Sequence, residues 1–122
     1  MNPIIVVDDE EVVRCLVARM LVAEGFQTLE ASNGVEALAV IEGLSGRVAL
    51  VVTDIVMPKL DGLALAARLL GSHPGIPVVL ISGYRDRELA DKGFAMPCAF
   101  LEKPFSAALL IAEVRRCLAA AA

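Results

Sequence analysis

The sequence predicts an α/β fold in which helices cover both faces of a doubly wound, five-stranded parallel sheet. Two observations carry this prediction. Short apolar runs rich in β-branched residues alternate five times with segments of helical periodicity. Hydrophobic residues make up 57% of the chain, against roughly 45–50% in ordinary globular domains counted on a slightly different residue set. A sheet buried on both faces requires such an excess.

The first strand–helix unit and the second strand are expected within the N-terminal 31 residues. Residues 3–8 form a short apolar run that ends in acid, which favours a buried strand. Residues 10–24 place apolar side chains at helical spacing, and Gly25 is a plausible stop signal. Residues 27–31 predict a second, weaker strand.

The middle of the chain carries the strongest strand signal. Asn33 with Glu36 three residues later is similar to a capping box, and it predicts the start of the second helix. Residues 48–53 are apolar and β-branched, and Asp54 closes this third strand. The following loop, residues 55–62, contains proline and glycine, which both break regular structure.

The C-terminal half continues the alternation of strands and helices. Residues 63–70 predict a short helix, and residues 78–81 predict a fourth buried strand. Residues 85–92 predict a charged helix that is exposed to solvent. Residues 98–101 predict the fifth strand, and residues 106–119 predict the final helix.

Composition excludes several classes of function. The length of 122 residues predicts a single domain over residues 1–122. The net charge of −4, with scattered Lys and Arg, argues against direct nucleic-acid binding. The apolar runs are far shorter than the roughly 20 residues of a membrane span, and the N-terminus has no signal-peptide layout. We therefore expect a cytoplasmic domain that binds no membrane.

The three cysteines offer no metal-binding or redox motif. Cys15, Cys98 and Cys117 form neither a CxxC spacing nor an even set. We expect all three to be buried, free thiols that act as small apolar side chains, which a reducing cytoplasm would suit.

Polar residues follow four of the five predicted strands. Asp8 and Asp9 end the first strand, Asp54 ends the third, Ser82 ends the fourth, and Lys103 closely follows the fifth. In sheets of this kind, ligands bind outside the carboxyl ends of the strands. The sequence therefore predicts that three carboxylates, a hydroxyl and an ammonium group gather at one edge of the sheet.

Each of these residues, taken singly, also has an ordinary interpretation. The first aspartates could cap a helix, Asp54 and Ser82 could lie in turns, and Lys103 could be a solvated surface lysine. The combination favours a site, because carboxylates within about 4 Å repel each other by roughly 1–4 kcal/mol per pair. A compensating cation is then expected, and an all-oxygen donor set suits Mg²⁺. The lysine and the serine would suit a phosphoryl group.

The motifs VDDE, TDIVMPKLDG, ISGY and LEKPF occur in this order, and together they resemble the receiver domain of two-component response regulators. The resemblance covers essentially the whole chain. It implies a flavodoxin-like strand order of 2-1-3-4-5 and a phosphorylation-dependent switch in a phosphorelay. It also implies a domain that is no enzyme beyond catalysing its own phosphoryl transfer and dephosphorylation. The ISGY and FLEKPF segments look most like receivers of hybrid histidine kinases.

The resemblance also implies roles for the acidic residues. Asp54 matches the phosphoacceptor, and Asp9 matches a direct ligand of Mg²⁺. Asp8 matches an acid that acts mainly through metal-bound water, and the backbone carbonyl of Val56 matches the third protein ligand. The expected donor is a phosphohistidine of a histidine kinase or a histidine phosphotransfer protein.

The remaining motif positions match the groups that bind and report the phosphoryl group. Ser82 matches the hydroxyl that bonds a phosphoryl oxygen, and Lys103 matches the lysine that pairs with it. The Lys103–Pro104 bond is expected to be cis, and Phe100 matches an aromatic switch position. The resemblance implies an output surface made by the fourth helix, the fifth strand and the fifth helix.

Particular side chains differ from the usual pattern or add bulk near the site. Phe100 has no hydroxyl with which to signal its position, and the side chain of Val56 cannot orient an attacking water. Tyr84 is bulky enough to shield the site. We expect from Val56 and Tyr84 that the domain does not shed its phosphoryl group rapidly.

Two other functions remain as alternatives. An Asp-nucleophile phosphatase would carry DxD after the first strand, whereas Asp8 and Asp9 are adjacent here and the candidate acceptor follows the third strand. A degenerate receiver would only mediate protein contacts, and a small-molecule phosphodonor with Mg²⁺ distinguishes it from an active one.

Overall fold

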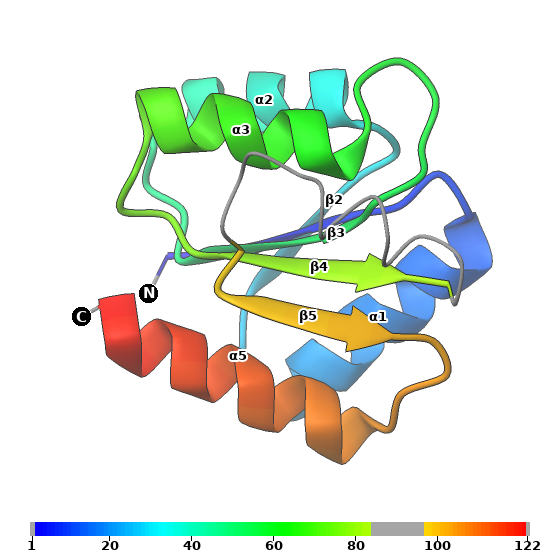
Figure 1. The fold of residues 1–122 in the computed structure, drawn as a ribbon. Coiled ribbons are helices and arrows are strands. Elements are labelled where there is room, and N and C mark those ends of the chain that lie inside the picture. Colours follow the sequence, from blue (N-terminus) through cyan, green and yellow to red (C-terminus); the bar gives the residue numbers. More distant parts are fainter. Residues whose placement is uncertain (1, 84–96, 122) are drawn as a thin grey trace.

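The structure, a computed structural model, describes residues 2–83 and 97–121. Its centre is a five-stranded parallel sheet in the order β2-β1-β3-β4-β5 (Figure 1). This confirms the predicted fold class and strand order. The predicted helix over residues 85–92 lies outside the described residues. The strands are β1 (Ile4–Val7), β2 (Thr28–Ala31), β3 (Leu50–Asp54), β4 (Val78–Ser82) and β5 (Ala99–Glu102).

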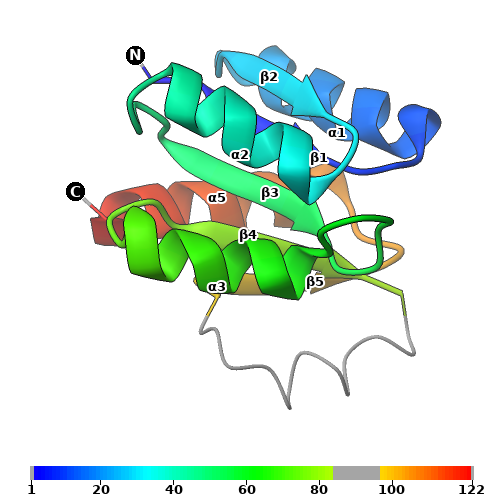
Figure 2. The same cartoon turned by 90° about the horizontal axis from the view of Figure 1, so that it is seen from above.

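The four described helices lie on both faces of the sheet. Helices α2 and α3 cover one face, and α1 and α5 cover the other, as the two orthogonal views show (Figures 1 and 2). Within the described part of the chain, no helix has the length and apolar character needed to cross a membrane. The helices are α1 (Glu11–Ala23), α2 (Gly34–Gly43), α3 (Gly62–Ser72) and α5 (Ala107–Ala121).

Alternating strand residues build two separate core layers. In β1, Ile5 and Val7 enter the cluster beneath α2 and α3, whereas Ile4 and Val6 enter the cluster beneath α1 and α5. All four side chains are at most 1% exposed. Burial on both faces explains why β1 is wholly apolar in the sequence and why β3 and β4 are apolar up to their last residues.

Local sequence signals set several helix boundaries. The Asn33 side chain accepts a hydrogen bond from the backbone N–H of Glu36 at 2.9 Å, which confirms the predicted start of α2. The Glu36 carboxylate, however, accepts from the Ser32 hydroxyl at 2.6 Å. Helix α3 begins earlier than predicted because Asp61 caps it through the N–H of Ala64 at 2.8 Å.

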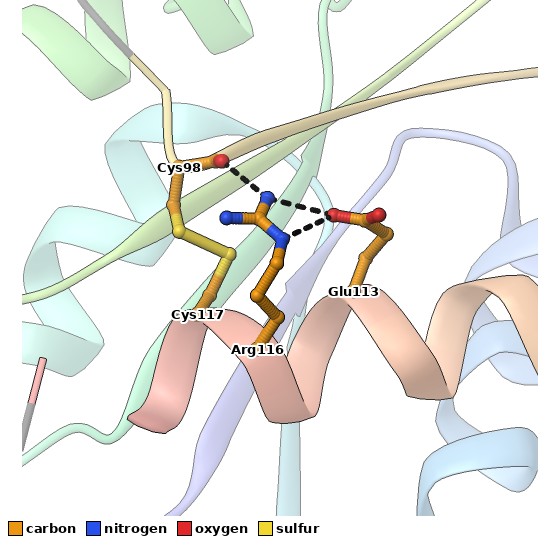
Figure 3. The surroundings of a disulfide bond; sticks show 4 residues. All are labelled: Cys98, Glu113, Arg116 and Cys117. Carbon is orange, nitrogen blue, oxygen red and sulfur yellow. Dashed lines mark hydrogen bonds and ion pairs between the residues drawn. A yellow bond between two sulfur atoms is a disulfide. The ribbon is translucent and has the colours of Figure 1, made fainter. Parts of the chain in front are cut away.

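The expectation of three free, buried cysteines is wrong. Cys98 and Cys117 form a disulfide with a Cα–Cα distance of 5.9 Å (Figure 3), which lies within the usual range for such bonds. Cys15 is free but partly exposed. The pairing escaped prediction because it depends on where α5 returns along the sheet, and the sequence separation of 19 residues gives no hint of that.

Candidate functional site

Three aspartates meet at the carboxyl edge of the sheet. Asp8 and Asp9 follow β1, and Asp54 ends the neighbouring strand β3. One carboxylate oxygen from each lies within 4.8 Å of the other two. Asp8 and Asp54 are only 3% and 6% exposed, whereas Asp9 is exposed to solvent. The predicted convergence of these side chains is present.

Asp54 lies between a backbone donor and a lysine. Its Oδ1 accepts a hydrogen bond from the N–H of Ile55 at 2.9 Å, and its Oδ2 is 3.5 Å from the Nζ of Lys103. Burial raises the pKa of the Asp54 carboxyl from 3.8 to about 6, although Lys103 opposes the rise and Asp8 adds to it. One positive charge therefore does not fully compensate the buried carboxylates.

Asp8 is held in place from two sides. Its Oδ1 accepts from the N–H of Glu10 at 2.9 Å, and its backbone carbonyl accepts from Nη1 of Arg14 at 3.0 Å. Burial raises the pKa of the Asp8 carboxyl, and the hydrogen bond from Glu10 opposes this rise. Sequence reasoning missed Arg14, because its position in the first helix gave no sign that it reaches back to the end of β1.

Ser82 presents a buried hydroxyl that has no hydrogen-bond partner among the described residues. The residue ends β4 and is 0% exposed. Its Oγ is the buried side-chain polar atom without a hydrogen-bond partner in the described part of the chain. Its carbonyl accepts from the backbone N–H of Lys103 at 2.8 Å, so the two residues are fixed side by side. Buried polar groups are normally paired, and this hydroxyl is therefore available to a ligand oxygen.

The other predicted site residues surround this centre less closely. The Lys103–Pro104 peptide bond is cis, as the resemblance implies. Phe100 is partly buried and packs against the core beneath α2 and α3. The side chain of Val56, in the loop after β3, is 55% exposed. Tyr84 lies outside the described residues.

Two glycines hold the loop after β3, and sequence reasoning recognised only the helix-breaking tendency of one of them. A Cβ on Gly62 would overlap the backbone carbonyl oxygen of Asp54. The N–H of Gly62 donates to the carbonyl of Ile55 at 2.8 Å. A Cβ on Gly34 would likewise overlap the carbonyl of Leu60, to which the N–H of Gly34 donates at 3.1 Å. Only glycine permits these approaches.

The donor set fits a hard divalent cation. Three carboxylates offer oxygen atoms within a small volume, and Mg²⁺ prefers oxygen ligands, including water. The carboxylates are buried beyond what one lysine compensates, as the raised pKa of Asp54 indicates. The three carboxylates can therefore hold a cation, and Lys103 and the Ser82 hydroxyl offer donors that suit an anion near Asp54.

Comparison with known protein sequences assigns the chain to a family. A sequence model of the response regulator receiver domain matches residues 4–115. The sensor kinase CckA of Brucella abortus is 41% identical over 120 residues, which are 94% of this chain and 12% of that protein. The transcriptional regulatory protein DctD of Rhizobium meliloti, described as acting in C4-dicarboxylate transport, is 34% identical over 115 residues, 93% of this chain and 24% of that protein.

Solved structures agree with this assignment. The receiver domain of NtrX from Brucella abortus superposes with a TM-score of 0.88 at 41% identity, covering 95% of this chain and 98% of that one. The receiver domain of a signal transduction histidine kinase from Syntrophus aciditrophicus gives 0.88 at 28% identity, covering 98% and 92%. Both comparisons extend over nearly the whole chain on each side. The chain belongs to the response regulator receiver domain family of two-component signalling proteins.

Proposed function

We propose that this domain is a phosphorylation-dependent switch in which Asp54 accepts a phosphoryl group from a phosphohistidine of a histidine kinase or phosphotransfer protein. The observation that carries the proposal is the position of Asp54. Its buried carboxylate lies beside Lys103, and the hydroxyl of Ser82, which has no partner in residues 2–83 and 97–121, lies at the end of the adjacent strand. This arrangement suits an anion that arrives at Asp54.

The chain's own residues position and neutralise the reacting groups. A carboxylate oxygen of Asp54 attacks phosphorus, and the imidazole nitrogen of the donor leaves with the bonding electron pair. Lys103 neutralises a phosphoryl oxygen, and Ser82 donates a hydrogen bond to another. Such positioning and charge stabilisation supply most of what phosphoryl transfer requires, so the domain would catalyse its own phosphorylation and dephosphorylation.

Magnesium would bind through Asp9, Asp54 and the backbone carbonyl of Val56, with Asp8 acting mainly through bound water. When bound, the ion offsets the repulsion between the anionic acceptor and the anionic donor. We expect Asp9→Ala to weaken Mg²⁺ binding more than Asp8→Ala does. Titration followed by NMR measures both affinities, and an unchanged affinity in Asp9→Ala would contradict this placement of the ion.

The proposed switch ends at a protein-binding surface. Phosphoryl oxygen draws the Ser82 hydroxyl toward Asp54, and Phe100 turns inward to fill the vacated space. Burial of such a ring contributes about 1.5–3 kcal/mol, whereas a shift from 1:99 to 99:1 requires about 5.5 kcal/mol. Contacts of the phosphoryl group with Ser82 and Lys103 must therefore supply the larger share. The fourth helix of the proposed output surface lies outside the described residues.

The proposed setting is the cytoplasm, where ATP-dependent histidine kinases supply phosphoryl groups. We propose that residues 1–122 form one domain, either alone or as the receiver of a longer hybrid kinase or regulator. The exposed apolar side chain of Val56 supports slow loss of the phosphoryl group, since it cannot orient an attacking water. Tyr84, whose bulk is the second reason for this proposal, is outside the described residues.

Phosphorylation with acetyl phosphate and Mg²⁺ tests the acceptor directly. Wild type should gain the mass of one phosphoryl group, and Asp54→Asn should gain none while remaining folded by circular dichroism. Asp61→Asn is the matched control, because Asp61 is an exposed helix cap that asparagine can replace. No mass gain on wild type would favour a degenerate receiver, and a gain retained in Asp54→Asn but lost in Asp8→Asn would favour an acceptor after β1.

A further inference from the structure

The disulfide lies at the end of β5 that is remote from the phosphoryl site. Cys98 directly precedes β5, and Cys117 lies on α5 (Figure 3). Lys103 follows the other end of the same strand. The covalent link thus closes a loop that contains β5, the turn after it and most of α5. Nothing in the proposed phosphoryl chemistry uses either sulfur.

The two cysteines differ in accessibility. Cys117 is 0% exposed and belongs to the core beneath α1 and α5. Cys98 is partly exposed. Both line a surface cavity of about 240 Å³, and Cys98 also lines a second cavity of about 150 Å³. An external thiol or disulfide can therefore approach the pair, and the more accessible residue for the first reaction is Cys98.

The backbone of Cys98 is held in place independently of its sulfur. Nη2 of Arg116 donates to the Cys98 carbonyl at 2.8 Å and to Oε2 of Glu113 at 2.7 Å (Figure 3). The Cys98 N–H donates to the carbonyl of Val78 at 2.8 Å. These contacts fix Cys98 to α5 and β4 when the sulfur–sulfur bond is open. The reduced thiols consequently remain close together, which favours closure of the bond again.

We propose that Cys98 and Cys117 form a reversible redox-modification site, which reacts with thiols and disulfides and controls how firmly the end of α5 is attached to β5. The cytoplasm proposed above is a reducing compartment, and disulfides in such compartments are usually regulatory or catalytic. The link acts on β5 and α5, which belong to the proposed output surface. Only this consequence for signalling depends on the proposed function, and the redox chemistry does not.

The exchange proceeds in two balanced steps. The Cys98 thiolate attacks one sulfur of a disulfide RSSR, the sulfur–sulfur bond breaks, and RS⁻ leaves. The Cys117 thiol then loses its proton to solvent, its thiolate attacks the Cys98 sulfur, and a second RS⁻ leaves. Two electrons pass from the protein dithiol to RSSR, and the two RS⁻ take up the two protons released. Reduction runs the same steps in reverse, beginning with attack of RS⁻ on the Cys98 sulfur.

Alkylation in glutathione buffers of varied oxidised-to-reduced ratio tests the site. The Cys15→Ser variant removes the third thiol, and mass spectrometry counts the labels. Labelling should change from two thiols to none within the buffered range, with little mixed disulfide on Cys98. Arg116→Ala should require a more oxidising ratio, because the two reduced thiols are then held together less closely.

Arg115→Ala is the matched control for Arg116. Arg115 is the neighbouring residue of α5, but it pairs with Glu24 at 3.2 Å and lies over the ring of Phe26. It should leave the redox midpoint unchanged. An equal shift in both arginine variants, a pair that stays reduced or stays oxidised at every ratio, or stable mixed disulfide on Cys98 would each overturn the proposal.

Hydrogen exchange provides a readout of the attachment itself. On reduction, backbone amides of residues 114–121 should exchange faster while those of α2 remain unchanged, and unchanged exchange in residues 114–121 would overturn the proposed control of α5. Both measurements are repeated in Asp54→Asn. Failure of phosphorylation at Asp54 would leave these results intact, whereas failure of the redox site would leave phosphorylation intact, so the two proposals are tested separately.

Discussion

The two ends of the strands in this sheet differ in how well their polar groups are paired. At the carboxyl end, Asp54 is buried with a raised pKa, and the Ser82 hydroxyl has no partner in the described part of the chain. At the amino end, both backbone polar groups of Cys98 are hydrogen-bonded, and its sulfur is bonded to that of Cys117. The polar groups at the carboxyl end are therefore incompletely compensated, whereas those of Cys98 at the amino end are hydrogen-bonded or covalently linked.

This difference separates the function of the molecule from its stability. A ligand gains most where protein groups are already desolvated and oriented but still unpaired, because the protein has met the cost of arranging them. Such groups destabilise the unliganded fold, so contacts elsewhere must offset them. The disulfide and the two-sided core supply this compensation without entering the site.

The largest expected effect concerns the disulfide at the amino end of β5. In the Cys15→Ser variant, reduction of Cys98–Cys117 should lower the free energy of unfolding by about 3 kcal/mol, because the bond closes a loop with a sequence separation of 19 residues. Urea denaturation with and without a reductant measures the change. Phosphorylation by acetyl phosphate should persist after reduction, and its loss would show that the two ends are not separable.

The next effect concerns the buried acid. The raised pKa means that folded Asp54 holds its proton more tightly than the unfolded chain does, so without Mg²⁺ stability falls as pH rises from 3.8 through about 6. Asp54→Asn should therefore be more stable than wild type near neutral pH by about 2 kcal/mol. The pKa shift sets an upper limit of roughly 3 kcal/mol on this gain.

Denaturation across this pH range, without Mg²⁺, measures the difference. The advantage of Asp54→Asn should shrink as pH falls from about 6 to about 4 and should be lost below that, since the wild-type carboxyl is then neutral in both states. Saturating Mg²⁺ should stabilise wild type and reduce the advantage at neutral pH. Asp61→Asn, at an exposed cap, should change stability little at any pH. A constant advantage over the whole range would show that charge burial is not its cause.

An effect of similar size is expected at the loop that joins the site to α3. Gly62→Ala forces a Cβ against the Asp54 carbonyl and should cost about 2 kcal/mol. Gly71→Ala, in the same helix with no atom within 4 Å of the added Cβ, should instead stabilise by about 0.5–1 kcal/mol. Thermal denaturation compares them. A Gly62→Ala variant that is as stable as wild type, or more stable, would contradict the proposed close packing.

The smallest expected effects are the stability changes on removal of each of two buried hydroxyls. Ser82 and Thr53 are both 0% exposed, but the Thr53 hydroxyl donates to the Asp54 carbonyl at 3.0 Å. Ser82→Ala should stabilise the unphosphorylated protein by up to about 1 kcal/mol, and Thr53→Val should destabilise it by about as much. Urea denaturation measures the free energy of unfolding of both variants. An equal loss of stability in the two would mean that the Ser82 hydroxyl is hydrogen-bonded in solution.

The sequence predicted where these polar side chains lie because the geometry of a parallel sheet determines most of it. Asp54 and Ser82 end strands and Asp8 directly follows one, and strands of one direction bring their carboxyl ends to one edge. Strong strand signals therefore placed these side chains before any contact was known. The strand order needed the resemblance, because hydrophobic pattern does not distinguish which parallel strands are neighbours.

Other features could not be predicted because they depend on distances between elements. The Cys98–Cys117 bond requires the last turns of α5 to pass the start of β5. Arg14 reaches the Asp8 carbonyl across a helix entrance, and Gly62 is needed because a carbonyl lies where its Cβ would be. Spacing in sequence reports none of these approaches.

The two glycines beside the loop after β3 also have a genetic consequence. Substitutions at Gly34 or Gly62 should appear in a screen for lost signalling together with those at Asp54, although neither glycine contributes a side chain to the chemistry. Their phenotypes should differ in kind, because a steric defect is sensitive to temperature and can be relieved by a second substitution that stabilises the fold, such as Gly71→Ala. Alleles at Asp54, the proposed phosphoacceptor, should have no such intragenic suppressors.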